Sequence, residues 1–316
     1  MAEDMLDIRT DLALEARESL AEEAGALRGI VAESFEAGRL VFVTKVTVQT
    51  EAGARRIGKP KGIYVTLECA QLPHGEEALR GEIAEVLAGQ IMELLGKRPA
   101  GVLIVGLGNR DMTADSLGPR VLAQLMITRG PGEDKKEGQT AVSGLVPGVL
   151  AQTGMETAEI VRGVVRETRP EAVLVIDALA AGSVHRLGTT IQLTDAGIQP
   201  GSGIGNHRSS LSRRTLGVPV IAVGVPMVVS AGAIVRDAGE LMQRLAREAS
   251  PEEKSAAGTA SGSGLLQDCL SEQLYERMGE TLAGLYVTPK DIDDTVKQIS
   301  LTIAEGLNRC FLGREA

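Results

Sequence analysis

From residue 100 onward, runs of aliphatic residues alternate with segments of helical periodicity. The aliphatic runs cover residues 101–107, 172–177, 189–195 and 219–229. Strands buried on both faces of a parallel sheet read as continuous hydrocarbon, whereas half-exposed strands alternate apolar and polar residues. Strands that alternate with helices are typical of an α/β fold. The pattern therefore predicts a doubly wound, mostly parallel sheet.

The first hundred residues have a different pattern. Residues 12–37 place apolar side chains, including Ile30, at roughly helical spacing, which predicts one or two amphipathic helices. Residues 40–48 and 61–69 alternate and are rich in β-branched residues, which favours an antiparallel pair of strands. Residues 76–97 again have the pattern of a helix. The N-terminal region is therefore expected to add an antiparallel β-structure to the α/β core.

Two polar stretches interrupt the alternation. Residues 129–138 and 249–264 are rich in small and charged residues, which predicts loops. A final helix is predicted over residues 288–311, with Thr288 as its cap and proline in its first turn. No internal repeat is visible in the sequence.

Composition limits the kind of function. Hydrophobic residues make up 43% of the 316 positions and aromatic residues only 2%, so the core must consist of aliphatic side chains. The net charge of −9, with scattered Lys and Arg, argues against a nucleic-acid surface, which needs a basic patch. Three distant cysteines exclude a disulfide framework. The acidic N-terminus and the lack of a long apolar run favour a reducing, cytosolic compartment and no membrane.

The stretch 103-LIVGLGNRDMTADSLGP-119 leads from an aliphatic strand into a glycine-rich turn. Gly106 and Gly108 fit a dinucleotide-binding fingerprint, but Asp111 stands at the third glycine position and would repel a phosphate. A non-catalytic, Rossmann-like nucleotide-binding module is therefore one alternative function, and the missing third glycine argues against it. Asn109 at the turn could orient the loop by hydrogen bonding.

Two carboxylates follow predicted core strands. Asp115 comes after the strand that ends near Gly106, and Asp177 ends the run 172–177. Functional groups of open α/β sheets gather beyond the carboxyl ends of the strands, and a buried acid requires a compensating partner. Paired carboxylates separate their pKa values, which provides one base and one acid for activating water. The structural alternative is that each aspartate caps a strand-to-helix junction.

His207 lies in the glycine-rich segment 200–208. A metal-dependent endopeptidase of the maturation type could bring together Asp115, Asp177 and His207 around a divalent ion. The sequence contains no HExxH or similar ligand spacing, so a surface histidine is the simpler interpretation, and no metal or cofactor is expected.

Several long motifs occur in order along the chain: 9-RTDLALEA-16, GLGNRDMTADSLGP, VIDALAAGSVHRLGTTIQLTDAGIQPGSGIGNHR and TLGVPVIAVGVPMVV. From residue 8 to the last helix, the sequence resembles the germination protease (spore protease) family of endospore-forming bacteria. The resemblance implies a fold related to hydrogenase-maturation endopeptidases, whose corresponding loop also begins G-x-G-N.

The resemblance implies a function as well. The family is an atypical aspartic endopeptidase, described as a homotetramer, that degrades the small acid-soluble proteins coating spore DNA during germination. Such a protein would work in the cytoplasm of the forespore and in the spore core. The family's candidate catalytic aspartates fall on Asp115 and Asp177. Neither lies in the D-T/S-G triplet of pepsin-like enzymes, so the complete pepsin-like mechanism is not assumed for this sequence.

The family is made as a zymogen that removes its own N-terminal segment. Its substrates are cut within a T-E-(F/I)-A type sequence, and residues 10-TDLA-13 resemble that site. We therefore expect self-cleavage between Asp11 and Leu12. Residues 1–11 would be a propeptide and residues 12–316 a single protease domain, in which 12–98 precede the catalytic core of 99–316. The alternative is that Asp11 caps the first helix.

Overall fold

The computed structural model of the chain describes residues 9–20, 27–75, 77–130, 139–201, 209–248, 278, 281–282 and 284–312. In these residues a single sheet of nine strands runs through the molecule in the order β1-β2-β3-β7-β8-β6-β4-β5, with β9 beside β8. The strands are β1 (Ile30–Ala37), β2 (Val41–Val48), β3 (Gly62–Glu68), β4 (Gly101–Gly106), β5 (Ala141–Leu145), β6 (Ala172–Ala181), β7 (Thr190–Thr194), β8 (Val220–Ser230) and β9 (Tyr286–Val287).

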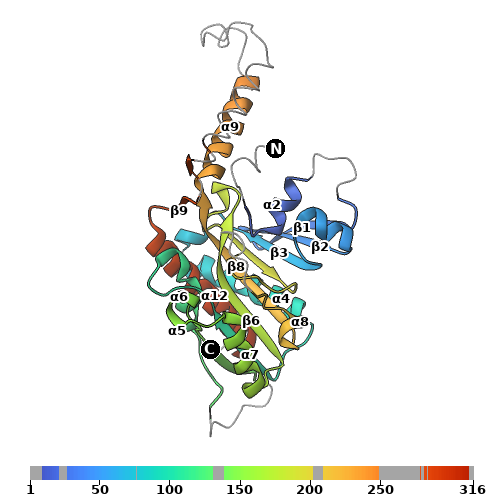
Figure 1. Cartoon of the computed structure of the whole chain (residues 1–316), viewed down its shortest axis with the longest axis vertical. Helices are drawn as coiled ribbons and strands as arrows, with labels where there is room; N and C mark the ends of the chain where they lie inside the picture. The colour runs from blue at the N-terminus through green and yellow to red at the C-terminus, as the bar shows by residue number, and fades with distance from the viewer. Residues whose placement is uncertain are drawn as a thin grey trace.

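Helices lie on both faces of this sheet (Figure 1). The α-helices are α2 (Ala13–Glu18), α3 (Glu51–Ile57), α4 (Glu77–Leu95), α5 (Leu117–Ala123), α6 (Leu150–Thr153), α7 (Thr157–Thr168), α8 (Arg213–Leu216), α9 (Ala231–Glu248) and α12 (Ile292–Leu312). Three short 3-10 turns are η1 (Leu72–His74), η2 (Thr113–Asp115) and η3 (Val184–Arg186).

The strands β5, β4, β6 and β8 form the parallel half of the sheet. Their aliphatic side chains are buried on both faces, as the continuous hydrocarbon runs predict. Helices α4, α5 and α12 cover one face, against residues such as Ile104 and Ile176. Helices α7 and α8 cover the other, against residues such as Leu103 and Val175. The predicted doubly wound α/β architecture is confirmed.

The other half of the sheet is antiparallel. Strands β1, β2 and β3 form a meander, so the predicted antiparallel addition from residues 40–48 and 61–69 is confirmed. Strand β7, predicted from residues 189–195 as part of the parallel alternation, is antiparallel to both β8 and β3. It thereby joins the N-terminal meander to the parallel half in one continuous sheet, and α2 and α3 cover the meander on the side of α7.

Two sequence predictions fail in detail. Of residues 12–37, predicted as helix, only α2 is helical within the described part, and residues 30–37 form β1, which pairs with β2 along its whole length. The last helix begins at Ile292 rather than 288, so Thr288 is not its cap, and the Asp291 carbonyl accepts the first helical bond from Thr295 N. The helix predicted at residues 76–97 is confirmed as α4. Most of the loop 129–138 and all of 249–264 lie outside the described residues.

Candidate active site

The glycine-rich turn connects β4 to η2 and α5. Here α5 passes so close to the end of β4 that no side chain fits at the point of contact. A Cβ at Gly106 would lie 2.4 Å from the carbonyl oxygen of Gly118, and a Cβ at Gly118 would lie 2.3 Å from that of Leu107. Gly118 thus permits the close helix–strand contact that the missing third glycine of a dinucleotide fingerprint would permit. Sequence reasoning overlooked this glycine because it comes seven positions after Asp111.

The turn folds back onto the carboxylate of Asp115. Gly108 has φ +109°, and a Cβ there would lie 1.9 Å from the carbonyl oxygen of Asp115. The backbone N–H of Asn109 donates to Asp115 Oδ2 over 2.8 Å, and the Asn109 side chain accepts from Asp111 N over 3.0 Å. An amide that would hold a phosphate in a nucleotide turn therefore holds a carboxylate of the same chain. This contact argues against nucleotide binding at the turn.

Asp177 lies beside the start of the same turn. The N–H of Leu107 donates to Ile176 O over 2.8 Å, which places Leu107 next to Asp177 in the parallel ladder. The turn η2, which ends at Asp115, also lies against β6 and β8. The two aspartates are therefore brought to the same region, beyond the carboxyl end of β4.

The sequence predicts that Asp177 ends its strand, but β6 continues to Ala181. The proposed role of Asp177 as a junction cap is therefore wrong. The residue is only 6% exposed, and its Oδ1 accepts from Ala178 N over 3.0 Å. A carboxylate in the middle of a buried strand is a costly arrangement, which supports a functional reason for it.

A row of paired residues runs from Asp177 across the sheet. Asp177 pairs with Gly224 of β8, Gly224 pairs with Gln192 of β7, and Gln192 pairs with Thr66 of β3. Paired residues of neighbouring strands point to the same face, so Asp177 and Gln192 share a face with only a glycine between them. Leu179 lies over that glycine, because a Cβ at Gly224 would meet its side chain at 2.5 Å.

The N-terminal segment lies on this face of the sheet. Asp11 N donates to Ala180 O over 3.0 Å, and Ala180 N donates to Asp11 Oδ2 over 2.9 Å. Gln192 Nε2 donates to Asp11 O over 3.1 Å, while Gln192 Oε1 accepts from Ala13 N over 2.7 Å. Leu12, between these contacts, is extended and fully buried. The alternative role of Asp11 as a helix cap is wrong, since Leu12 holds the N-cap position of α2.

A half-buried lysine contacts Thr10, the residue before Asp11 and Leu12. Lys59 Nζ donates to Thr10 O over 2.7 Å. Burial lowers the pKa of Lys59, and the charges of Asp11 and Glu15 act in the opposite direction. A cavity of about 630 Å³ opens beside these residues, and Arg213 is among the basic side chains in its wall. The surroundings of Asp11 are therefore suited to a carboxylate side chain.

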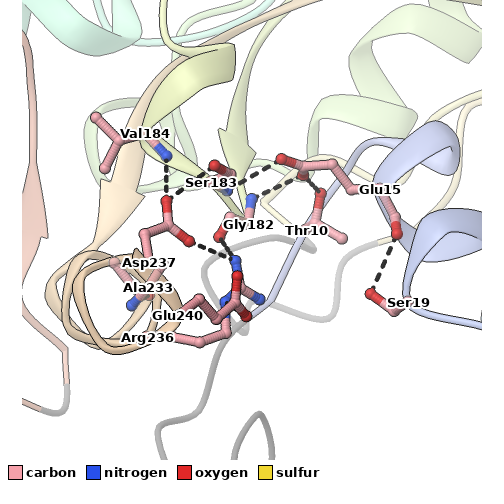
Figure 2. Close-up of polar contacts among 11 residues, drawn as sticks. Thr10, Glu15, Ser19, Gly182, Ser183, Val184, Ala233, Arg236, Asp237 and Glu240 are labelled. Atoms are coloured by element: carbon pink, nitrogen blue, oxygen red, sulfur yellow. Dashed lines mark hydrogen bonds and ion pairs between the residues drawn. The ribbon is translucent and has the colours of Figure 1, made fainter. Parts of the chain in front are cut away.

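Glu15 ties the segment to the loop that follows β6 (Figure 2). Its Oε2 accepts from Gly182 N over 2.8 Å and from the hydroxyl of Thr10, and its Oε1 accepts from Ser183 N over 3.0 Å. Burial raises the pKa of Glu15, and these hydrogen bonds offset part of that effect. The N-terminal segment and the end of β6 are thus joined through one buried carboxylate.

Helix α9 holds the same loop from the other side (Figure 2). Asp237 Oδ2 accepts from Ser183 Oγ over 2.8 Å and from Val184 N over 3.0 Å. Arg236 Nη2 donates to Gly182 O over 2.6 Å and to Asp237 Oδ1 over 2.9 Å. The loop after β6 is therefore held between the N-terminal segment and α9.

Other candidate chemistry finds less support. Among the described residues, no group of three or more His, Cys, Asp and Glu side chains could hold a metal ion, and His207 lies outside those residues. Cys69 and Cys310 are buried thiols, and burial raises the pKa of both, that of Cys310 to about 12, which disfavours the nucleophilic thiolate. Within the described part of the chain, every helix is too short or too polar to cross a membrane.

Comparison with known proteins identifies the family. Residues 8–269 match the family model described as germination protease. This chain belongs to the germination protease family. A germination protease from Caldanaerobacter subterraneus subsp. tengcongensis is 42% identical over 315 residues, which cover 96% of this chain and 94% of that relative. The germination protease of Clostridium acetobutylicum is 38% identical, with 96% and 95% covered. That of Bacillus thuringiensis subsp. konkukian is 36% identical, with 95% and 92% covered.

Among solved structures, a [NiFe] hydrogenase maturation protease HycI from Thermococcus kodakarensis KOD1 matches with a TM-score of 0.34 and 15% identity. The match covers 69% of this chain and 99% of that one. The germination protease relatives cover nearly the whole chain, so the protein is a peptidase and its substrate is a protein.

Proposed function

We propose that this germination protease is an endopeptidase in which Asp115 and Asp177 activate water for peptide-bond hydrolysis. The observation that carries the proposal is that η2, which ends at Asp115, lies against β6, the strand in which Asp177 is buried, beyond the end of β4. The turn holds the carboxylate of Asp115 there. One carboxylate takes a proton from the attacking water, and the other, protonated, donates to the carbonyl oxygen or to the leaving amine. A coupled pair of this kind titrates as a unit.

The proposed substrates are small acid-soluble spore proteins, degraded during germination in the spore core. Such small proteins are extended when they are not bound to DNA, and an extended chain suits a protease site. The net charge of −9 favours attack on substrate that has left the DNA over attack on the complex.

The protein is proposed to be made as a zymogen that cuts itself between Asp11 and Leu12. The proposal is supported by the position of this bond, on the same face of the sheet as Asp177 and in direct contact with Gln192. Removal of residues 1–11 would also remove the contact of Asp11 with Ala180 and that of Thr10 with Lys59.

The first experiment follows the intact mass of the full-length protein over time, from mildly acidic to neutral pH. We expect the loss of residues 1–11 in the wild type and none in Asp115→Asn or Asp177→Asn. The control is Asp111→Asn, an exposed aspartate of the same turn, which should process normally. Processing by either aspartate variant would contradict the two-carboxylate mechanism.

A chelator arm of the same experiment tests the alternative of a metal-dependent maturation-type endopeptidase. Hydrolysis by two carboxylates should continue unchanged in the chelator. Processing that stops with chelator and resumes with added divalent metal would favour the metal enzyme and would require ligands in addition to Asp115 and Asp177.

A further inference from the structure

The side chain of Gln192 spans the bond between Asp11 and Leu12. Its Nε2 donates to the carbonyl oxygen of Asp11 over 3.1 Å, and its Oε1 accepts from Ala13 N over 2.7 Å. The two contacts resemble those that a neighbouring strand would make to residues 11 and 13. They fix both sides of the peptide bond that leads into Leu12.

Gln192 is held rigidly in this position. It lies within β7, between two strands of the same sheet, and the residue is only 6% exposed. A buried amide in a regular strand has few rotamers available, so its N–H is preorganised rather than recruited during the reaction.

Gln192 also lies in line with a candidate catalytic group. It is separated from Asp177 by Gly224, and two strand spacings place their Cα atoms roughly 10 Å apart. The Leu179 side chain covers Gly224 between them, and residues 11 and 12 lie on the same face of the sheet, held by Gln192 and Ala180. Within this row, Asp177 provides an acid and Gln192 provides a hydrogen-bond donor.

We propose that Gln192 is a catalytic residue that stabilises the oxyanion formed at the carbonyl of residue 11. This inference rests on the proposed function. The oxygen of water bonds to the carbonyl carbon, a proton passes to the ionised aspartate, and negative charge develops on the oxygen that faces Gln192 Nε2. When the C–N bond breaks, the proton of the other aspartate passes to the nitrogen of Leu12. Gln192 gains and loses no proton.

The same role extends to substrate proteins. Once residues 1–11 have left, the Nε2–H of Gln192 and the N–H of Ala180 are free to bind a new peptide. The contact of Ala180 N with Asp11 Oδ2 indicates that this peptide carries a carboxylate side chain on the residue before the cut. The ligand is thus an extended peptide with an acid at that position.

The test uses the full-length chain and two substitutions of nearly equal size. Gln192→Met removes both hydrogen bonds, and Gln192→Glu keeps the shape but donates only when its carboxyl is protonated. Loss of one oxyanion donor slows catalysis by about 100- to 1000-fold, so we expect Gln192→Met to self-cleave that much more slowly at every pH. The rate of Gln192→Glu relative to wild type should be low at pH 8 and rise as the pH falls toward 5.

Gln49→Glu is the matched control, because it makes the same change at an exposed glutamine. Its rate relative to wild type should stay near one at all pH values. Thermal unfolding of each variant identifies those that do not fold. If Gln192→Met is unfolded, the pH dependence of Gln192→Glu tests the proposal, because the protonated glutamic acid side chain has the shape of glutamine and also carries a hydrogen-bond donor.

Two results would overturn the proposal. One is self-cleavage of folded Gln192→Met at the wild-type rate. The other is a rate ratio for Gln192→Glu that does not change with pH. Asp115→Asn and Asp177→Asn are measured in parallel: if they stay inactive, only the role of Gln192 is lost, whereas if they self-cleave, the proposed function itself is contradicted.

Discussion

At the scale of single residues, the position of Asp115 depends on Gly108. This glycine has φ +109°, where an L-residue is strained, and the space of its missing side chain is occupied by the backbone of Asp115. A side chain there would push Asp115 away from the N–H of Asn109. A displacement of about 1 Å at a reacting group can cost roughly 100-fold in rate.

Gly108→Ala is therefore expected to reduce peptidase activity about 100-fold or more. The control is Gly96→Ala, because Gly96 also has a positive φ, +73°, but has open space around it, so that only the backbone strain of about 1–2 kcal/mol is shared. Activity on a peptide substrate and thermal stability are measured for both. Equal activity of the two folded variants would show that the contact at Gly108 does not position Asp115.

The sequence is enough to propose Asp115 and Asp177 as candidate catalytic residues, because acids beside aliphatic runs are conspicuous. It does not identify Gln192. A glutamine in a strand carries no local signal, and the role proposed for it depends on the register that aligns β7, β8 and β6. Gly118 could have been found, since it follows the turn at the start of a helix, but its contact with Gly106 depends on the path of the intervening loop.

At the scale of elements, strand pairing overrides local periodicity. The parallel strands were predictable because continuous aliphatic runs of their length are typical of strands that are buried on both faces of a sheet. Residues 30–37 were not, because alternating and helical spacings overlap in so short a segment, and pairing with β2 decides the outcome. For the same reason, the direction of β7 could not be read from its sequence.

The docking of α2 is expected to depend on pH through Glu15. Burial raises the pKa of Glu15 in the folded protein above its usual value of 4.5, so the folded state binds a proton more readily than the unfolded state. This contribution to stability is fully present below pH 4.5 and is lost as the pH rises through the folded pKa. Protection of the α2 amides from hydrogen exchange should therefore decrease over that range in the wild type, and the decrease should be smaller in Glu15→Gln.

Glu18→Gln is the control for this measurement. The Glu18 side chain is 50% exposed in its ion pair with Arg186, so its substitution should change the pH dependence of α2 much less than Glu15→Gln does. Identical pH dependence in the wild type and in Glu15→Gln would contradict the role assigned to Glu15.

At the scale of the whole molecule, α9 projects from the end of β8 beyond the body of the protein (Figure 1). Its outer part carries Leu241, Met242 and Leu245, which are 46%, 69% and 56% exposed. An exposed apolar group of this kind is typical of a contact surface. We propose that further copies of the same chain cover it in a homotetramer, as the family resemblance implies.

Leu245→Glu should therefore reduce the mass of the particle in sedimentation experiments, because a charge would be buried at the contact between copies. The control is Arg244→Glu, which changes the charge of the neighbouring exposed position without removing an apolar group. A tetramer that persists in Leu245→Glu, or a wild type that sediments as a monomer, would contradict the assembly through α9.

The burial of Leu12 bears on whether the self-cleavage proposed above can be reversed. Hydrolysis converts the neutral amide of Leu12 into an amino group that is largely charged at neutral pH. That charge would stand in a fully buried site and at the positive end of the α2 dipole, where a cation is unfavourable. The new terminus must move toward water and cannot return to its former place. The cut would thus be irreversible, because the charge that it creates keeps the new N-terminus away from the end of residue 11.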